Sequence, residues 1–449
     1  MQKFTIYTFI MGQLFQSLNI LNENGLQNQA TDILIENGTI VAIGQNLSSD
    51  GHEVVNAKNW IVSLGWKDCF TVCRVPGSEH KDTLTSLVKS AHLGGYTELL
   101  LVSGGTTALD SAVKVEFIVQ NFKNQDIKIH PSGTISYKQE GKEITEMYDM
   151  FLSGAKFFTD GIQHLKNPEL LKRALLYTQT FDSKLMVYSE DSYMSENGMV
   201  NEGEVSAVLG MKTRPALAEE IAVIRNIYIA EYTNRAVHLS GISSAKSVEI
   251  IREAKQKGIN VTADVSIANL FYTDEVLKEF DTQYKVLPVI RTAKDKEALW
   301  KALLDDRIDV IATDHAPHTL EEKQQSYLNA PSGGPLVQHA VVALFEAFHQ
   351  GKISVEKIVE KMCHNPAKIF KIEKRGFIKE GYYADLVIVN AGLPWSVKKE
   401  NILAKCGWSP FEGYTFKSRI THTFVNGQLV YNAFKVKDIR AGKRLLFNR

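Results

Sequence analysis

The stretch of sequence that decides the fold runs from Leu64 to Gly77 and reads LGWKDCFTVCRVPG. Side chains alternate along a strand, so residues 70, 72 and 74 would share one face and residues 69, 71 and 73 the other. If Arg74 points into a functional site, Phe70 and Val72 point there as well, whereas Cys69 and Cys73 point away toward covering helices. We therefore predict that both cysteines are small buried apolar side chains and not metal ligands.

Downstream of this stretch, short apolar segments alternate with amphipathic helical ones. The predicted strands cover residues 155–158, 185–189, 236–240, 260–265 and 309–313. Clear helical patterns lie between some of them, at residues 217–232 and at 245–257. Alternating strands and helices predict a parallel sheet, and this number of units predicts a closed (β/α)₈ barrel of the TIM type in an α/β protein.

Both ends of the chain are rich in predicted strands instead. Residues 32–44 contain two predicted strands around an Asn-Gly turn. Residues 385–389 and 421–431 show the same pattern of short apolar strands. We expect the two ends to meet in one small β-sandwich. The predicted domains are residues 1–61 and 376–449 for the sandwich and residues 62–375 for the barrel.

Composition excludes several classes of protein. The chain has 449 residues, with 51 Lys and Arg against 51 Asp and Glu, so no basic field would attract nucleic acid. No apolar run approaches the ~20 residues of a membrane span, so we predict no membrane association. Four scattered cysteines are too few for a disulfide framework, which favours the reducing cytoplasm.

Several short motifs point to a family. Residues 312–318 read ATDHAPH and are followed by Glu321, Glu322 and Lys323. Other matching blocks are residues 141–143, 201–203, 365–367, 381–389 and 409–413. With Asp68, Arg74, Pro76 and Gly77, they resemble the dihydroorotases, which are cyclic-amide hydrolases of the amidohydrolase superfamily. The first stretch of that family reads roughly G-x-x-D-x-H-x-H-x-R-x-P-G, and the chain looks like the type with an aspartate between two metals.

The resemblance implies that the metal site is nearly lost. In the family, four histidines hold zinc at places that are occupied here by Phe70, Val72, Tyr188 and Gly241. Only Asp160 and Asp314 remain as residual ligand positions. Zinc sites draw on nitrogen or sulfur ligands and usually need three or more of them. We therefore predict no metal and no other cofactor.

The loss of these ligands matters because ring opening needs a nucleophilic water. Metal coordination lowers the pKa of water from ~15.7 to about 7, which corresponds to roughly 12 kcal/mol. A general base contributes ~10²–10⁴-fold, or about 3–5 kcal/mol. Asp314 is thus predicted to be a vestigial general base.

The substrate pocket is predicted to be partly retained. Arg74 and His318 resemble the family's binders of the substrate carboxylate, and a guanidinium suits that group well. The alternative for Arg74 is a structural salt bridge, to Asp68 or Glu190. Other positions differ from the family. Residues 102–106 lack the asparagine that the family has there, Leu287 stands in the place of a second family asparagine, and residues 266–269 differ from the family motif at that point.

Three functions remain open. The favoured hypothesis is an inactive dihydroorotase homologue of pyrimidine biosynthesis that acts as a structural or regulatory partner of aspartate transcarbamoylase. The alternative is an active dihydroorotase, or a related cyclic-amide hydrolase, that opens dihydroorotate to N-carbamoyl-aspartate through a remodelled site. A third is a sensor that binds a carboxylate-bearing small molecule through Arg74 and His318. In each case we expect a homo-oligomer.

Overall fold

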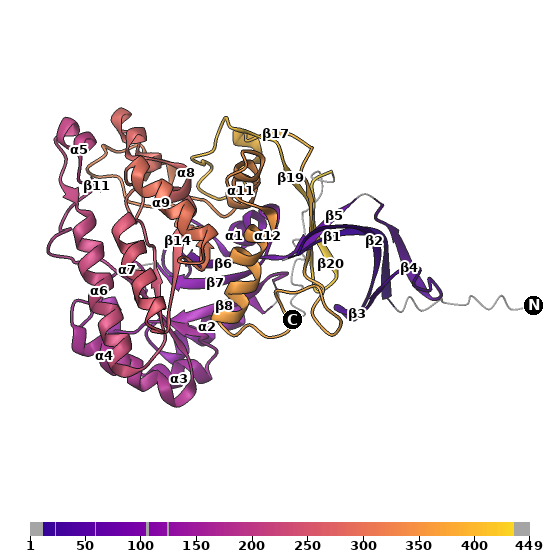
Figure 1. The fold of residues 1–449 in the computed structure, drawn as a ribbon, viewed down its shortest axis with the longest axis horizontal. Coiled ribbons are helices and arrows are strands. Elements are labelled where there is room, and N and C mark those ends of the chain that lie inside the picture. The colour runs from indigo at the N-terminus through magenta and orange to yellow at the C-terminus, as the bar shows by residue number, and fades with distance from the viewer. Residues whose placement is uncertain (1–11, 23, 59, 105–106, 124, 435–449) are drawn as a thin grey trace, which may run out of the picture.

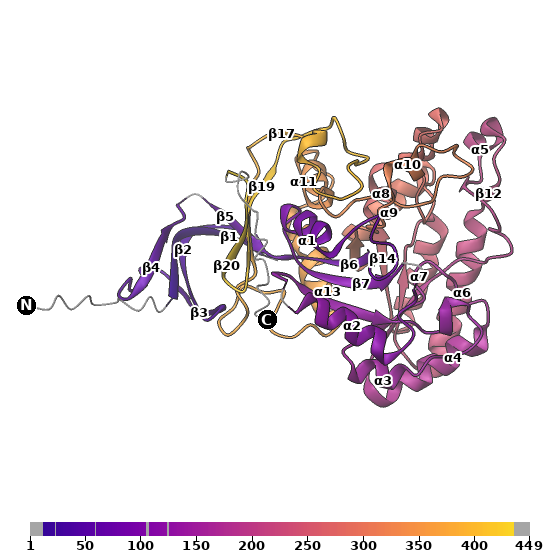
Figure 2. The same cartoon turned by 180° about the vertical axis from the view of Figure 1, so that it is seen from behind.

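The structure, a computed structural model, describes residues 12–434 apart from residues 23, 59, 105–106 and 124. The outermost parts of both predicted sandwich segments therefore lie outside the described residues. Two eight-stranded sheets dominate the fold, one in the middle of the chain and one built from both ends (Figures 1 and 2). Among the described residues, no helix is long and apolar enough to cross a membrane.

The central sheet is a barrel of parallel strands that neighbour one another in chain order. Its strands are β6 (Trp66–Cys73), β7 (Tyr96–Ser103), β8 (Lys128–Gly133), β9 (Phe157–Phe158), β10 (Lys184–Tyr188), β13 (Val237–Ser240), β14 (Val261–Ser266) and β15 (Val310–Ala312). Two contacts close the barrel between its last and first strands. The Val72 N–H donates to the His315 carbonyl at 2.8 Å, and the Thr313 N–H donates to the Asp68 carboxylate at 2.8 Å.

Helices surround the barrel, as the sequence predicts. The longer ones are α1 (Leu84–Leu93), α2 (Ala112–Phe122), α4 (Pro168–Tyr177), α6 (Ala216–Thr233), α7 (Ala245–Gln256), α9 (Ala293–Leu304) and α11 (Ala340–His349). The shorter ones are α3 (Met147–Leu152), α5 (Glu204–Leu209), α8 (Ile267–Phe271), α10 (Leu320–Lys323), α12 (Val355–Val359) and α13 (Asn365–Ile369). Local sequence sets where they begin. For example, the Ser244 hydroxyl accepts from the Ser247 N–H at 3.0 Å and caps α7.

The second sheet joins the two ends of the chain. Its strands lie in the order β20 (Gln428–Asn432), β19 (Arg419–Val425), β16 (Leu386–Asn390), β5 (Ile61–Leu64), β1 (Gly12–Asn22), β2 (Gly25–Glu36) and β3 (Thr39–Gly44), and β4 (His52–Asn56) pairs with β1. The remaining strands form two small two-stranded sheets. In one, β11 (Val200–Asn201) pairs with β12 (Thr213–Arg214), and in the other, β17 (Trp395–Ser396) pairs with β18 (Thr415–Phe416). The predicted barrel with a separate β unit from both ends is confirmed.

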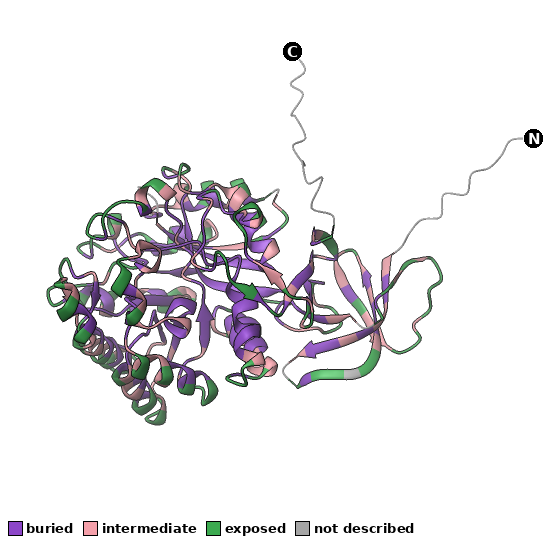
Figure 3. Ribbon diagram, turned by 90° about the horizontal axis from the view of Figure 1, so that it is seen from above, coloured by how far each residue is buried: buried purple, intermediate pink, exposed green. Residues whose placement is uncertain are grey.

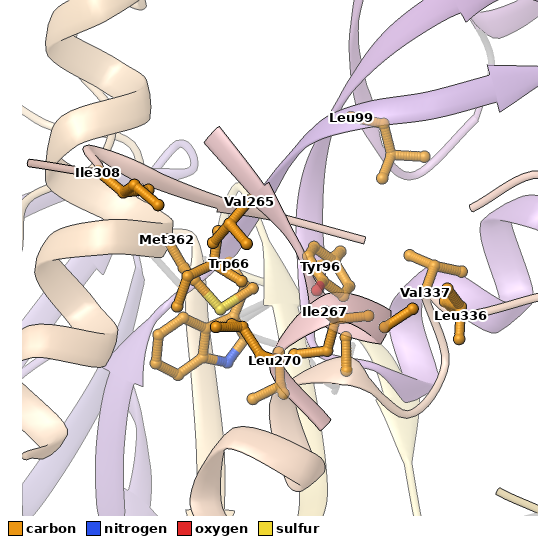
Figure 4. Close-up of a cluster of buried hydrophobic side chains, with 14 of the residues drawn as sticks. Trp66, Tyr96, Leu99, Val265, Ile267, Leu270, Ile308, Leu336, Val337 and Met362 are labelled. Atoms are coloured by element: carbon orange, nitrogen blue, oxygen red, sulfur yellow. The ribbon is translucent and has the colours of Figure 1, made fainter. Parts of the chain in front are cut away.

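A single glycine lets the chain pass from one sheet to the other. Gly65 lies between β5 and β6, and a Cβ atom there would come within 2.1 Å of the Thr97 hydroxyl oxygen. The close approach leaves no room for a side chain. Beyond this point Trp66 and Tyr96 are fully buried, in a cluster that includes Leu99, Val265 and Met362 (Figure 4). Figure 3 shows that burial is concentrated in the barrel strands and the inner faces of the helices.

A buried ion pair joins the first two barrel strands. The Lys67 Nζ lies 2.6 Å from the Glu98 Oε1, and the His130 Nε2 lies 2.8 Å from the Glu98 Oε2. Burial favours the neutral acid, but the Lys67 ammonium and the His130 contact together hold the pKa of Glu98 well below its usual range. The carboxylate is therefore charged, buried and dependent on its partners.

We expect Lys67→Met to lower the free energy of unfolding by about 3–5 kcal/mol, because it leaves a buried charge without its cation. The double variant Lys67→Met/Glu98→Leu should recover most of the loss, since it removes both charges. Chemical denaturation measures both. A single variant within about 1 kcal/mol of wild type would contradict the buried charge.

Candidate active site

A cavity of about 350 Å³ opens where the barrel strands end at their carboxyl sides. This is the face on which barrel enzymes carry their sites. The predicted site residues all line it, since the cavity wall includes Arg74, Asp160, Asp314 and His318. Other lining residues are Phe70, Val72, Val102, Gln139, Gln163, Ser266, Leu287 and Ser332. The structure thus brings Arg74 and His318, which are 244 positions apart in the chain, to one cavity.

Arg74 and His318 contact each other at the cavity wall. The Arg74 Nη2 lies 3.1 Å from the His318 Nε2, its Nε–H donates to the Pro317 carbonyl at 3.1 Å, and its Nη1 donates to the Gly104 carbonyl. Burial lowers the pKa of Arg74 to about 10, so the guanidinium remains charged at neutral pH. An arginine has five N–H groups, and two are left for a ligand after these contacts.

The alternative of a structural salt bridge for Arg74 is wrong. Asp68 instead accepts from the Thr313 N–H, and Glu190 pairs with Arg214. Among the described residues, Arg74 has no carboxylate within ion-pair distance of its guanidinium. Glu322 and Asp82 raise the pKa of Arg74 from a distance without pairing with it, so an anionic ligand would meet a cation that no carboxylate contacts directly.

His318 is held as a neutral imidazole. Burial, together with the Arg74 and Lys81 cations, lowers its pKa to about 3, and Glu322 acts in the opposite direction. Its Nδ1 lies 3.1 Å from the Lys81 Nζ, and its Nε2 lies 3.1 Å from the Ser332 carbonyl oxygen. His318 thus positions Arg74 and the cavity wall without adding charge.

Asp160 anchors a loop. Its carboxylate accepts from the Ile135 N–H at 2.8 Å, from the Ser136 N–H at 3.0 Å and from the Ser136 hydroxyl at 2.5 Å. Burial raises its pKa to about 6, against these hydrogen bonds. The oxygens are therefore committed to the segment that follows β8.

Asp314 has the opposite environment. Its Oδ2 atom is buried and has no hydrogen-bond partner among the described residues. Burial and the nearby Asp264 and Asp68 carboxylates raise the pKa of Asp314 well above its usual value, against a hydrogen bond from Ser266. The neutral acid is thus favoured over the carboxylate, which weakens Asp314 as a general base toward water.

Comparison with known proteins places the chain in a family. A model described as "Dihydro-orotase-like" matches residues 64–247, and one described as "Amidohydrolase family" matches residues 206–430. A relative named dihydroorotase, from Acetivibrio thermocellus, is 34% identical over 91% of this chain and 95% of its own length. The chain belongs to the dihydroorotase family of amidohydrolases. The family predicted from the motifs is confirmed.

Other relatives agree with this placement. A protein named dihydroorotase from Endomicrobium trichonymphae is 36% identical over 89% of this chain and 94% of its own. Among solved structures, the L-hydantoinase (dihydropyrimidinase) from Arthrobacter aurescens superposes with a TM-score of 0.83 at 20% identity, over 94% of this chain and 96% of that one. At that identity the likeness concerns the fold alone.

Apolar side chains fill the first two places where dihydroorotases carry zinc-binding histidines. Phe70 and Val72 are buried in a cluster inside the barrel with Phe157, Met186 and Phe370, among others. A Cβ atom on Gly104 would lie 2.0 Å from the Val72 Cγ1, so the valine side chain packs directly on that glycine. The floor of the cavity is therefore packed apolar core.

The other two histidine places are closed as well. Gly241 has a φ of +70°, a conformation that L side chains rarely adopt, and a Cβ atom there would lie 2.9 Å from the Pro288 Cγ and 3.3 Å from the Tyr188 Cε2. Tyr188 is itself buried at the end of β10. A phenol and a proline ring thus occupy the space into which a side chain at position 241 would extend.

The residues present do not fit the zinc site of the dihydroorotase family. The four replaced positions offer no imidazole, and Asp160 is already hydrogen-bonded on both oxygens. Within the described part of the chain, no three His, Cys, Asp or Glu side chains are grouped so that they could hold a metal ion. Zinc would find too few nitrogen or sulfur donors here.

Both cysteines are buried, as predicted, but only Cys73 lies on the predicted helix side of β6. Cys73 packs in the outer cluster beneath the helices, but Cys69 belongs to the same interior cluster as Phe70 and Val72. The register between β6 and β7 is irregular between Asp68 and Thr71, which breaks the alternation of side chains at this point. Both thiols are buried, and burial raises their pKa values, that of Cys73 to about 11.

Sequence reasoning missed the residues that hold the cavity wall. The Lys323 Nζ donates to the carbonyls of Pro331 at 3.0 Å, Gly333 at 3.1 Å and Lys285 at 3.3 Å, and so fixes the segment that carries Ser332. The sequence around Lys323 gives no indication that the partners of this lysine are backbone atoms. Asp264 was missed too; it accepts from the Gly241 N–H at 2.7 Å and pairs with His238 at 3.0 Å.

Proposed function

We propose that this chain is a dihydroorotase homologue of pyrimidine biosynthesis that no longer opens the dihydroorotate ring. The observation that carries the proposal is the packing of the former ligand space. Phe70, Val72 and Tyr188 fill it with carbon atoms, and Gly241 has no room for a larger side chain. Without a metal-activated water, the reaction lacks its nucleophile at neutral pH.

Asp314 does not compensate for the missing metal. Burial and the neighbouring Asp264 and Asp68 carboxylates favour the protonated form of this carboxyl group, which opposes a role as general base. Even an ionised Asp314 would supply only about 3–5 kcal/mol of the roughly 12 kcal/mol that metal coordination contributes. The energetic difference favours an inactive site.

We further propose that the chain serves as a structural or regulatory partner, with aspartate transcarbamoylase of the same pathway as the candidate. The argument is that the whole barrel and the motifs on its outer loops persist while the catalytic ligands are gone. A discarded enzyme has no reason to keep a complete core, whereas a scaffold needs its shape.

Co-expression of the chain with the aspartate transcarbamoylase of the same organism tests the partnership. We expect the two proteins to elute together in size-exclusion chromatography and the transcarbamoylase kinetics to change on binding. Separate elution across micromolar concentrations, with unchanged kinetics, would reject this partner and leave a ligand-binding role.

An active enzyme is the second candidate, because relatives at 34–36% identity over about nine-tenths of the chain are named dihydroorotase. The cavity of this chain also retains polar groups that such an enzyme would use, since Arg74, His318 and Asp314 all line it. This alternative requires a nucleophile other than zinc-bound water. Steady-state assays of the purified chain distinguish the two candidates.

A carboxylate ligand is expected to bind at Arg74 under either hypothesis. Arg74→Gln should weaken the binding of dihydroorotate about 10–100-fold, because a charge-assisted hydrogen bond contributes ~1.5–3 kcal/mol. Isothermal titration calorimetry measures the change. Arg173→Gln, at an exposed arginine on α4, is the matched control and should leave the affinity unchanged. Equal affinity in both variants would place the ligand elsewhere.

A further inference from the structure

The Arg74 guanidinium and the apolar floor of the cavity meet at Gly104. The Arg74 Nη1 donates to the Gly104 carbonyl, and a Cβ atom on Gly104 would lie 2.0 Å from the Val72 Cγ1. The same glycine thus contacts both the cation and a methyl group of the floor. A ligand that binds to Arg74 in the cavity therefore lies next to apolar surface.

Apolar side chains continue around the cavity from several elements. Its lining includes Phe70, Val72, Val102, Val286, Leu287 and Leu336. The first three lie on β6 and β7, and the other three come from segments that follow β14 and β15. At three of these positions, 70, 72 and 287, the dihydroorotase motifs have histidine or asparagine. All three differences put an apolar side chain in the place of a polar one, so the wall has lost hydrogen-bonding groups.

Several polar side chains of the lining are already used within the chain. The hydroxyl groups of Ser103 and Ser266 accept from backbone N–H groups at 3.2 and 3.3 Å. Gln139 and Gln163 line the cavity from loops, and Gln163 is exposed. The Oδ2 of Asp314 has no partner among the described residues, but it is a single atom. A ligand with several polar ring groups would leave some of them unpaired.

Dihydroorotate and cyclohexanecarboxylate differ in this respect alone. Both are six-membered rings that carry one carboxylate, but the dihydroorotate ring has two N–H and two carbonyl groups. A polar group that is buried without a partner loses its hydrogen bonds to water, which weakens binding. The cyclohexane ring has no such groups and gains from apolar burial. A cavity of about 350 Å³ is near the lower end of the ~300–1,000 Å³ of ligand pockets, which suits a single ring.

We propose that the cavity binds a small monocarboxylate with an apolar ring in preference to dihydroorotate, with the carboxylate on Arg74 and the ring against Val72 and Leu287. The preference rests on the proposed function, because it concerns a barrel that keeps the cation for a carboxylate and opens no ring. The ligand class is therefore an anionic head group on an apolar body.

Isothermal titration calorimetry of the full chain tests the preference. We expect cyclohexanecarboxylate to bind at least about tenfold more tightly than dihydroorotate, because a buried polar group without a partner costs about that factor. Arg74→Gln should weaken the binding of both ligands by a similar factor, since both share the carboxylate. Dihydroorotate that binds as tightly as cyclohexanecarboxylate would overturn the proposal, and so would the absence of binding of either ligand.

Leu287→Asn tests whether the apolar wall sets the preference. An amide in the wall should weaken the binding of cyclohexanecarboxylate and strengthen that of dihydroorotate, so that the ratio of the two affinities falls at least about threefold. Val72→Thr keeps the shape of the side chain, adds a hydroxyl group to the floor and should act in the same direction.

Leu152→Asn, at a 66% exposed position on α3, is the matched control and should leave both affinities unchanged. Thermal unfolding checks that each variant is folded. A preference that neither Leu287→Asn nor Val72→Thr alters would exclude this wall as the site of the ring.

Activity and affinity are measured separately. Ring opening of dihydroorotate by the purified chain would reject the proposed function, and the preference with it. Equal affinities without ring opening would reject only the ligand class and leave the proposed function in place.

Discussion

No hydrolysis of dihydroorotate above background is expected from the purified chain, in either direction of the reaction. The reason is energetic: metal coordination of water contributes roughly 12 kcal/mol, and burial favours the protonated form of the surviving Asp314 carboxyl group. Asp314→Ala should accordingly have no effect on the measured rate. The assay follows ring opening and ring closure separately, with the protein at micromolar concentration.

A zinc-dependent member of the dihydroorotase family, assayed in parallel, is the positive control for this prediction. The informative contrary result is turnover that disappears in Asp314→Ala. It would show that the remodelled cavity supports catalysis and would favour the active alternative. Turnover that persists in that variant would point to a contaminating enzyme instead.

The second large effect concerns metal content. We expect less than stoichiometric zinc after mild dialysis, because the four histidine places are occupied by Phe70, Val72, Tyr188 and Gly241. Elemental analysis of the protein measures it. Two tightly held ions per chain would mean that other side chains bind them.

A double variant makes this prediction sharper. Phe70→His/Val72→His restores one pair of ligands, yet it should still bind no stoichiometric zinc. Position 241 remains closed, since a side chain there would meet Pro288 and Tyr188. Recovery of two ions by this variant would show that the barrel mouth is more adaptable than its packing indicates.

Much of the fold could be predicted from sequence because its causes are local. The apolar stripe of α7, with Val248, Ile251 and Ala254, is buried as its helical spacing indicates. Short apolar segments between such helices predicted the parallel barrel. The motif that contains Asp314 and His318 predicted that these residues belong to one site, and both line the cavity.

Other features depend on neighbours that are distant in the chain. Cys69 faces the barrel interior because an irregular register in β6 interrupts the alternation, and a strand pattern cannot reveal such a shift. Arg74 binds two carbonyls and His318 in place of a carboxylate, since its partners come from loops some 30 and 240 residues away.

The sequence by itself determined the family, the barrel and the loss of the four histidines, because residue identity and periodicity are properties of the chain alone. Only the tertiary structure decided that the vacated places are closed. Packing brings Val72 onto Gly104 and Tyr188 beside Gly241, and close packing of a core leaves no space that later ligands could use. The tertiary structure likewise decided which of the two apolar faces of α6 is exposed, since a sequence pattern does not tell which face the barrel covers.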